Sequence, residues 1–134
     1  MSNIILTTLN ARYTHTSIAL HYLYANMQEL QEQTKICEFT INENIQDIAE
    51  KLLDENPSII GIGVYIWNVI AVHELVTTLK QINPEIKIVI GGPEVSYKPL
   101  RLDFSMVDYI IEGEGDIAFY KLCSQIIIDS VPSE

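Results

Sequence analysis

Two kinds of hydrophobic pattern alternate along this chain. Short apolar runs rich in β-branched residues predict five strands, at Ile4–Leu9, Lys35–Ile41, Ile59–Ile66, Ile86–Ile90 and Tyr109–Glu112. The third run, IIGIGVYI, is nearly all apolar, which is typical of a central strand that is buried on both faces.

Helical patterns fall between these runs and after the last one. Apolar residues recur at helical spacing in three sets, which are Ile45, Ile48, Ala49, Leu52 and Leu53, then Val72, Leu75, Val76 and Leu79, then Phe119, Leu122, Cys123 and Ile126. A first helix is predicted from Ser17 to about Leu30, with an inner face of Ala19, Leu23, Met27 and Leu30. Asn44 is placed to cap the second helix, and the pairs Asn56-Pro57 and Asn83-Pro84 end the second and third helices.

Strands that alternate with helices of this length indicate βαβ units and a parallel sheet covered on both faces. We therefore predict an α/β fold of the flavodoxin-like (Rossmann-like) kind, a doubly wound five-stranded parallel sheet of order 2-1-3-4-5 in a three-layer α/β/α arrangement. Residues 1–134 are expected to form a single domain. The segment Pro93–Met106 has no clear helical period, so the fourth crossover is predicted to be short or irregular.

Composition and charge narrow the classes of partner. The net charge is −10 and the eight lysines and arginines are scattered, which argues against a nucleic-acid partner. No run of about 18 apolar residues and no basic flank before the first apolar run are present, so we expect a soluble cytoplasmic protein without a membrane segment. Cys37 and Cys123 lie in apolar surroundings without metal-site spacing, and we interpret them as small hydrophobic residues.

In doubly wound sheets, ligands bind beyond the carboxyl ends of the strands. Four loops follow those ends here, NARYTHTS, YIWN, GGPEVS and EGEG, and together they carry glycines and large aromatic residues. The pair Gly91-Gly92 suggests that a ligand or another backbone lies close to the fourth strand. Simpler readings stay open: Tyr65 and Trp67 could continue strand alternation, Asn68 could be a helix cap, and the acidic Glu114 could complement a helix dipole.

The loop after the first strand carries two further candidates. Arg12 and His15 lie where an anionic group of a ligand could meet the start of the first helix. A neutral imidazole at His15 could also ligate a metal, although a loop histidine is more often solvated or a cap.

The segments LNARYTHTSIALHYLYAN, GVYIWN, IVIGGPEVS and DYIIEGEG together resemble the N-terminal cobalamin-binding domain of cobalamin-type radical S-adenosylmethionine enzymes. The resemblance implies a corrinoid held at the strand tips, with Gly91 and Gly92 lining the groove for its nucleotide tail. It also implies a C-terminal radical S-adenosylmethionine barrel in the same polypeptide, which would carry S-adenosylmethionine and a 4Fe-4S cluster. The cofactor-binding residues that we predict are Asn10, Arg12, Tyr13, Thr14, His15, Tyr65, Trp67, Asn68, Gly91, Gly92, Pro93, Glu94, Glu112, Gly113 and Glu114.

The chain also departs from that family's patterns. Members that ligate cobalt from below use Asp-x-His-x-x-Gly; if Asn10 stands at the Asp position, Arg12 stands at the His position and His15 is out of register. The Ser-x-Leu often found after strand three is replaced by Val64-Tyr65-Ile66, so Tyr65 or Trp67 could cover the lower corrin face instead. The cluster motif CxxxCxxC is absent, and we expect a fragment of a longer enzyme without catalytic residues of its own.

Two other interpretations keep the same fold. The domain could be a degenerate scaffold that binds no cofactor and serves interaction or gating. It could instead carry flavin mononucleotide, with Thr14, Thr16 and Ser17 around the phosphate. A phosphorelay receiver is discarded, because Tyr65 and Trp67 stand where an acidic residue would be needed.

Overall fold

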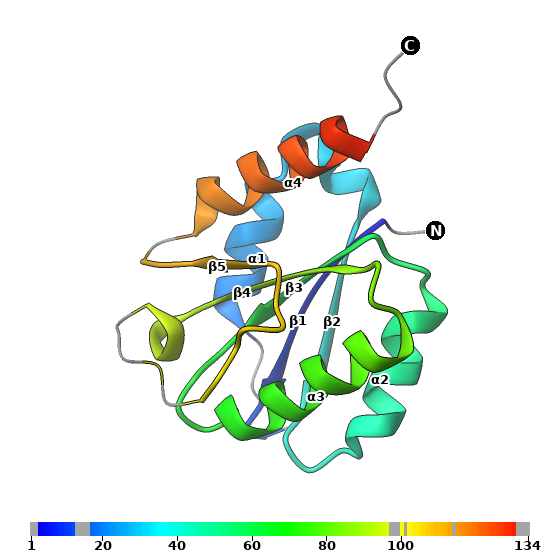
Figure 1. The fold of residues 1–134 in the computed structure, drawn as a ribbon. Helices are drawn as coiled ribbons and strands as arrows, with labels where there is room; N and C mark the ends of the chain where they lie inside the picture. The colour runs from blue at the N-terminus through cyan, green and yellow to red at the C-terminus, as the bar shows by residue number, and fades with distance from the viewer. Residues whose placement is uncertain (1–2, 13–16, 97–99, 101, 114, 131–134) are drawn as a thin grey trace.

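A computed structural model describes residues 3–12, 17–96, 100, 102–113 and 115–130, and it has one five-stranded sheet between two layers of helices (Figure 1). The strand order is β2-β1-β3-β4-β5, and every pairing is parallel. The predicted flavodoxin-like arrangement is thereby confirmed. The strands are β1 Ile4–Asn10, β2 Thr34–Thr40, β3 Ile59–Gly63, β4 Lys87–Gly91 and β5 Tyr109–Ile111.

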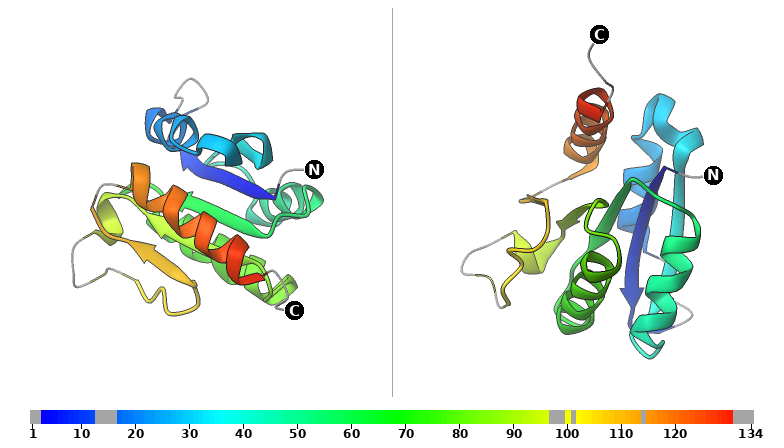
Figure 2. Two further views of the ribbon diagram at one scale, coloured as in Figure 1. Left: turned by 90° about the horizontal axis from the view of Figure 1, so that it is seen from above. Right: turned by 45° about the vertical axis from the view of Figure 1, so that its right-hand side comes forward.

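Alternation along the strands assigns the helices to two faces. Helices α2 (Ile45–Asp54) and α3 (Val69–Ile82) cover one face, and α1 (Ile18–Ala25) and α4 (Asp116–Ser130) cover the other (Figures 1 and 2). The first face buries residues such as Ile5, Ile60 and Ile88, while their neighbours Ile4, Ile59 and Val89 belong to the second. Side chains that point alternately to the two faces explain why β1 is buried along its whole length.

Helix boundaries agree with the sequence where capping chemistry is strong. The Asn44 side chain accepts a hydrogen bond from the Asp47 backbone N–H at 3.1 Å, which confirms it as the cap of α2. The predicted inner face of α3 is fully buried, with Val72, Leu75, Val76 and Leu79 all at 0% exposure.

Two predicted elements are wrong in extent. The first helix ends at Ala25, and a 3₁₀ turn, η1 (Gln28–Gln33), follows it. Gln28 has a φ of +50°, which an α-helix cannot contain, so the helix cannot continue to Leu30. Within the predicted inner face Ala19 is exposed, whereas its neighbour Leu20 is buried. The third strand ends at Gly63 instead of Ile66, because the chain turns directly afterwards.

The fourth crossover is irregular, as the missing helical period predicts. Its described part includes the short 3₁₀ turn η2 (Pro93–Val95) and a stretch of bends and turns, residues 102–108, in which Phe104 is buried in the core. Within the described part of the chain, no helix has the length and apolarity needed to span a membrane. Cys123 is buried among apolar residues, and this burial raises the pKa of its thiol to about 12, consistent with an inert packing role.

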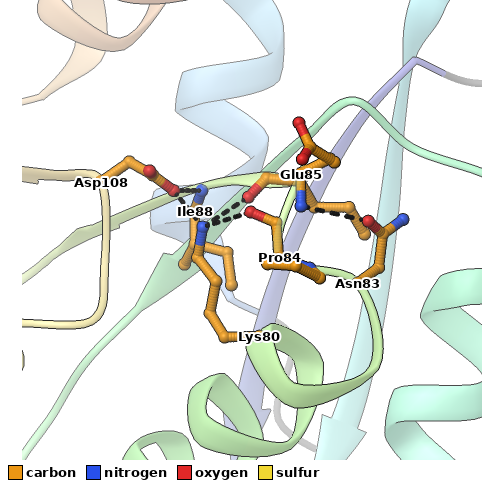
Figure 3. A network of polar contacts seen from close by, with 7 residues as sticks. Lys80, Asn83, Pro84, Glu85, Ile88 and Asp108 are labelled. Atoms are coloured by element: carbon orange, nitrogen blue, oxygen red, sulfur yellow. Dashed lines mark hydrogen bonds and ion pairs between the residues drawn. The ribbon is translucent and has the colours of Figure 1, made fainter.

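A polar network closes the amino ends of β4 and β5 (Figure 3). Lys80 on α3 donates from Nζ to the carbonyl of Ile86 at 2.8 Å and to the Asp108 carboxylate at 2.7 Å. The same Asp108 oxygen accepts the Ile88 backbone N–H at 2.8 Å. The Lys80 and Asp108 side chains are only 16% and 23% exposed, so water offers little replacement if one partner is lost. This network sets where β5 starts to pair with β4.

We expect Lys80→Met to lower the free energy of unfolding by about 1–3 kcal/mol, because it leaves Asp108 and the Ile86 carbonyl without their cationic donor. Urea unfolding followed by circular dichroism measures this change. Lys121→Met, at an exposed lysine on α4, is the matched control and should stay within about 0.5 kcal/mol of the parent. Equal effects of the two substitutions would contradict a structural role for the network.

Candidate functional site

A pocket of about 450 Å³ lies at the carboxyl ends of the strands, between the sheet and helices α1 and α4. All six glycines of the chain line it, and we call it the glycine pocket; they are Gly61, Gly63, Gly91, Gly92, Gly113 and Gly115. Most of its other lining residues are apolar, among them Leu6, Leu20, Leu23 and Ile111. Such a concave, largely apolar pocket beyond the strand ends is suited to a flat organic group.

The floor of the glycine pocket is bare backbone. Gly63 on β3 and Gly91 on β4 are register partners, so they lie side by side in the sheet. A Cβ atom added to Gly91 would have only ordinary contacts, the nearest with the Ile111 carbonyl oxygen at 3.6 Å. Gly61 differs, because a Cβ there would lie 2.8 Å from the ring of Phe119, which already fills that space. The open part of the floor is therefore at Gly91, because a Cβ atom on Gly63 would lie 3.2 Å from the Tyr65 ring and 3.3 Å from Thr8 Oγ1.

Gly92 is required by a neighbouring backbone. Its φ is +114°, and a Cβ atom there would lie 2.5 Å from the carbonyl oxygen of Val64. Both facts exclude a larger side chain without a shift of the main chain. The two adjacent glycines thus have separate reasons, since Gly92 lets the turn after β3 pass closely and Gly91 keeps the floor open.

Asn68 connects the tips of β1 and β3. Asn68 is only 1% exposed, and its Oδ1 accepts a hydrogen bond from the Tyr65 backbone N–H at 2.8 Å. Its Nδ2 donates to the Leu9 carbonyl at 3.0 Å and to Thr8 Oγ1 at 3.2 Å. Asn68 is the N-cap residue of α3, as the simpler reading expects, but its amide makes no capping hydrogen bond to that helix.

The turn after β3 presents an aromatic pair. The rings of Tyr65 and Trp67 are stacked with centroids 4.6 Å apart and an interplanar angle of 2°. Trp67 is 49% exposed, and its Nε1 donates to the Leu9 carbonyl at 3.2 Å. Continued strand alternation is therefore the wrong explanation for these residues, since β3 has already ended and their rings lie parallel. The pair offers a flat apolar surface beside the glycine pocket, whose lining includes Tyr65.

A carboxylate from β2 bonds to the last residue of β1 and to the residue that precedes α1. Glu38 Oε1 accepts the Asn10 Nδ2 donor at 3.0 Å and the Ser17 backbone N–H at 2.6 Å. Asn10 is thus buried, and its amide is hydrogen-bonded within the protein, whereas Arg12 is exposed. The predicted residues Tyr13, Thr14, His15 and Glu114 lie outside the described part of the chain, as does Thr16.

Ser17 does not support the flavin reading of this loop. Its hydroxyl accepts a hydrogen bond from the Leu20 backbone N–H at 3.3 Å and so caps α1. Within the described residues, no group of three or more histidine, cysteine, aspartate or glutamate side chains is arranged to hold a metal ion.

The predicted site residues divide into two groups. Those that line the glycine pocket are Tyr65, Gly91, Gly92, Pro93 and Gly113. Those at the same edge but not among its lining residues are Asn10, Arg12, Trp67, Asn68, Glu94 and Glu112. Sequence reasoning missed Gly61, Gly63 and Gly115. The first two were detectable, because two glycines at a spacing of two in a strand must share one face.

The comparison with protein-family models identifies a family. The sequence model of the B12 binding domain matches residues 4–122. The chain is 26% identical over 87 residues to the cobalamin-dependent radical SAM methyltransferase TokK of Streptomyces tokunonensis, an alignment that covers 63% of this chain and 12% of TokK. This chain therefore corresponds to a small part of that relative's length.

Solved structures share the fold. The cobalamin-dependent S-adenosylmethionine radical enzyme OxsB with aqua-cobalamin bound superposes with a TM-score of 0.73 at 17% identity, covering 96% of this chain and 19% of OxsB. A cobalamin-binding protein from Desulfitobacterium hafniense DCB-2 gives a TM-score of 0.61 at 19% identity, over 92% of this chain and 58% of that protein.

Substitution at the two adjacent glycines separates their roles. We expect Gly92→Ala to lower the free energy of unfolding by about 2–4 kcal/mol, because the added methyl group meets the Val64 carbonyl and φ is positive. Gly91→Ala should change it by less than about 1 kcal/mol, because its new Cβ has room. Urea unfolding of both variants measures the difference, and equal losses would contradict this assignment.

Proposed function

This chain belongs to the B12 binding domain family, and we propose on that premise that it binds cobalamin across the carboxyl ends of its parallel strands. The observation that carries the proposal is the glycine pocket, whose open floor at Gly91 lies beside the stacked Tyr65–Trp67 pair. The pocket suits a flat group inserted between sheet and helices, and the aromatic pair suits a flat group above the turn. A corrinoid with a nucleotide tail has two such flat groups, the base of its tail and the corrin ring.

The residues fit the two parts of this cofactor separately. We assign its nucleotide tail to the glycine pocket, where Leu6, Leu23 and Ile111 would contact it and Gly91 would let it approach the sheet. This assignment takes up the groove role that the family resemblance implies for Gly91. Gly92 would contribute by shaping the turn, since its own conformation is fixed by Val64.

We assign the corrin ring to the surface formed by Tyr65 and Trp67. A half-exposed Trp67 whose Nε1 is already bonded to Leu9 can offer its ring face without leaving a polar atom unsatisfied. Arg12, exposed at the neighbouring tip, could approach the polar rim of the ring. Cobalamin, when bound, supplies cobalt-centred alkyl-transfer chemistry, and the residues of this chain hold and orient it.

The proposed function also involves a partner domain. We propose that the domain presents its corrinoid to a radical S-adenosylmethionine domain of the same polypeptide, which would carry S-adenosylmethionine and an iron–sulfur cluster. The support is that the chain corresponds to 12% of TokK and 19% of OxsB, whose names describe such enzymes. On this proposal the domain performs no chemistry of its own and acts through positioning.

The first test is an absorbance titration of the purified chain with hydroxocobalamin, followed by desalting. We expect a stoichiometric corrinoid band to be retained, and its spectrum to report whether an imidazole has replaced the cofactor's own lower base. Loss of the band on desalting from both this chain and the full-length protein would contradict cobalamin binding. Retention by the full-length protein alone would place part of the binding surface in the partner domain.

Filling the glycine pocket tests the place of the tail. Ala19 on α1 lines the pocket, and Ala25 lies on the same helix outside it. We expect Ala19→Phe to weaken hydroxocobalamin binding about tenfold or more, because the ring occupies space that the tail needs. Ala25→Phe should leave the Kd within about twofold of the parent. An unchanged Kd in Ala19→Phe would place the tail elsewhere.

Trp67 gives a direct signal from the corrin surface, because it is the only tryptophan of the chain. Corrinoids absorb where tryptophan emits, so we expect hydroxocobalamin to quench most of the Trp67 fluorescence. Trp67→Phe should remove this signal while absorbance still reports binding. A bound corrinoid that leaves the emission of Trp67 unchanged would contradict the assignment of the ring to the aromatic pair.

A further inference from the structure

The Ser96 side chain joins the tips of β4 and β5 beyond the end of their ladder. The described pairing of these strands stops at Gly91 and Ile111. Beyond it each strand turns through a glycine with positive φ, at +114° for Gly92 and +74° for Gly113. The Ser96 hydroxyl lies between the two turns, where it donates to the Gly92 carbonyl at 2.7 Å and accepts the Gly113 N–H at 3.1 Å.

The two hydrogen bonds of Ser96 have different structural roles. The bond to Gly92 spans four residues and is of the kind that serine often makes within a short turn, so alone it would only stabilise η2. The bond from Gly113 spans 17 residues and connects two separate loops. One hydroxyl thereby takes the place of the next rung of the β4–β5 ladder.

The Ser96 bridge connects two glycines that line the glycine pocket. Gly92 and Gly113 both line the pocket, whereas Ser96 itself is not among its lining residues. A Cβ atom at Gly113 would meet nothing within 4 Å, so the turn is loosely packed at this position. The Ser96 hydroxyl hydrogen-bonds to the backbone of both turns and so links them directly.

We propose that Ser96 is a positioning residue that sets the spacing of the β4 and β5 tips and so favours corrinoids that carry a complete nucleotide tail. The inference rests on the proposed function, because it requires the tail to enter the glycine pocket. Ser96 acts through the backbone of Gly92 and Gly113 and does not touch the cofactor. Its effect should therefore appear in discrimination between corrinoids and not in binding of the corrin ring.

The experiment compares two ligands and three variants of the purified chain. Hydroxocobalamin carries the nucleotide tail, and cobinamide is the same ring without it. Ser96→Ala removes the bridge, Ser96→Thr keeps a hydroxyl, and Ser130→Ala is a matched control that removes a hydroxyl bonded only to the nearby Ile127 carbonyl. Dissociation constants for both ligands are measured by absorbance, and urea unfolding verifies that each variant is folded.

We expect Ser96→Ala to weaken hydroxocobalamin binding about threefold to tenfold, the net worth of one hydrogen bond, and cobinamide binding less than twofold. Ser96→Thr and Ser130→Ala should bind both ligands as the parent does. Amide hydrogen exchange of Gly113, followed by NMR without any ligand, should become faster in Ser96→Ala alone, because its N–H loses its acceptor.

Three results would overturn the proposal. Equal weakening of both ligands by Ser96→Ala would make the serine a general stabiliser, and unchanged affinity for hydroxocobalamin would remove it from the site. Unchanged Gly113 exchange would deny the bridge itself. In each of these cases the parent chain still binds hydroxocobalamin, so the proposed function stands; a parent chain that binds neither ligand would overturn both.

Discussion

The arrangement of the carboxyl edge depends on the buried amide of Asn68. The strands end here, so backbone groups of β1, β3 and the following turn lose their ladder partners, and each would carry a penalty if buried without a replacement. Asn68 offers one acceptor and two donors from a single side chain and serves Tyr65, Leu9 and Thr8 together. Because Asn68 satisfies the hydrogen bonds of these groups, the turn with Tyr65 and Trp67 and the glycine floor can remain accessible to a ligand.

Different kinds of side chain hold the amino and the carboxyl ends of the strands. At the amino edge a lysine and an aspartate hold β4 and β5, while the described bridges around the glycine pocket come from amides and hydroxyls, those of Asn68, Thr8 and Ser96. These bridges are neutral, while carboxylates also lie at this end of the strands: Asp116 lines the pocket and Glu38 accepts hydrogen bonds from Asn10 and Ser17. Most of the pocket lining is nevertheless apolar in a protein of net charge −10.

The sequence predicted the sheet order because apolar periodicity and the pairs of asparagine and proline mark the elements independently of tertiary contacts. It also predicted the edge at which Tyr65, Gly91 and Gly113 come together, since parallel strands all end there. It failed where distant contacts decide the outcome. Only the folded chain shows that Val64 constrains Gly92, and that the side chain of Asn68 bonds to the tips of strands instead of to the helix whose N-cap it occupies.

The concentration of every glycine around one pocket also affects the unfolded chain. Glycine has the largest backbone freedom before folding, so each one raises the conformational entropy that folding must overcome. Replacing glycines by alanine is a common way to stabilise a protein, because it reduces this entropy at positions that tolerate a methyl group. Here all six glycines line the pocket, so any gain in stability by this route would change the lining of the proposed binding site.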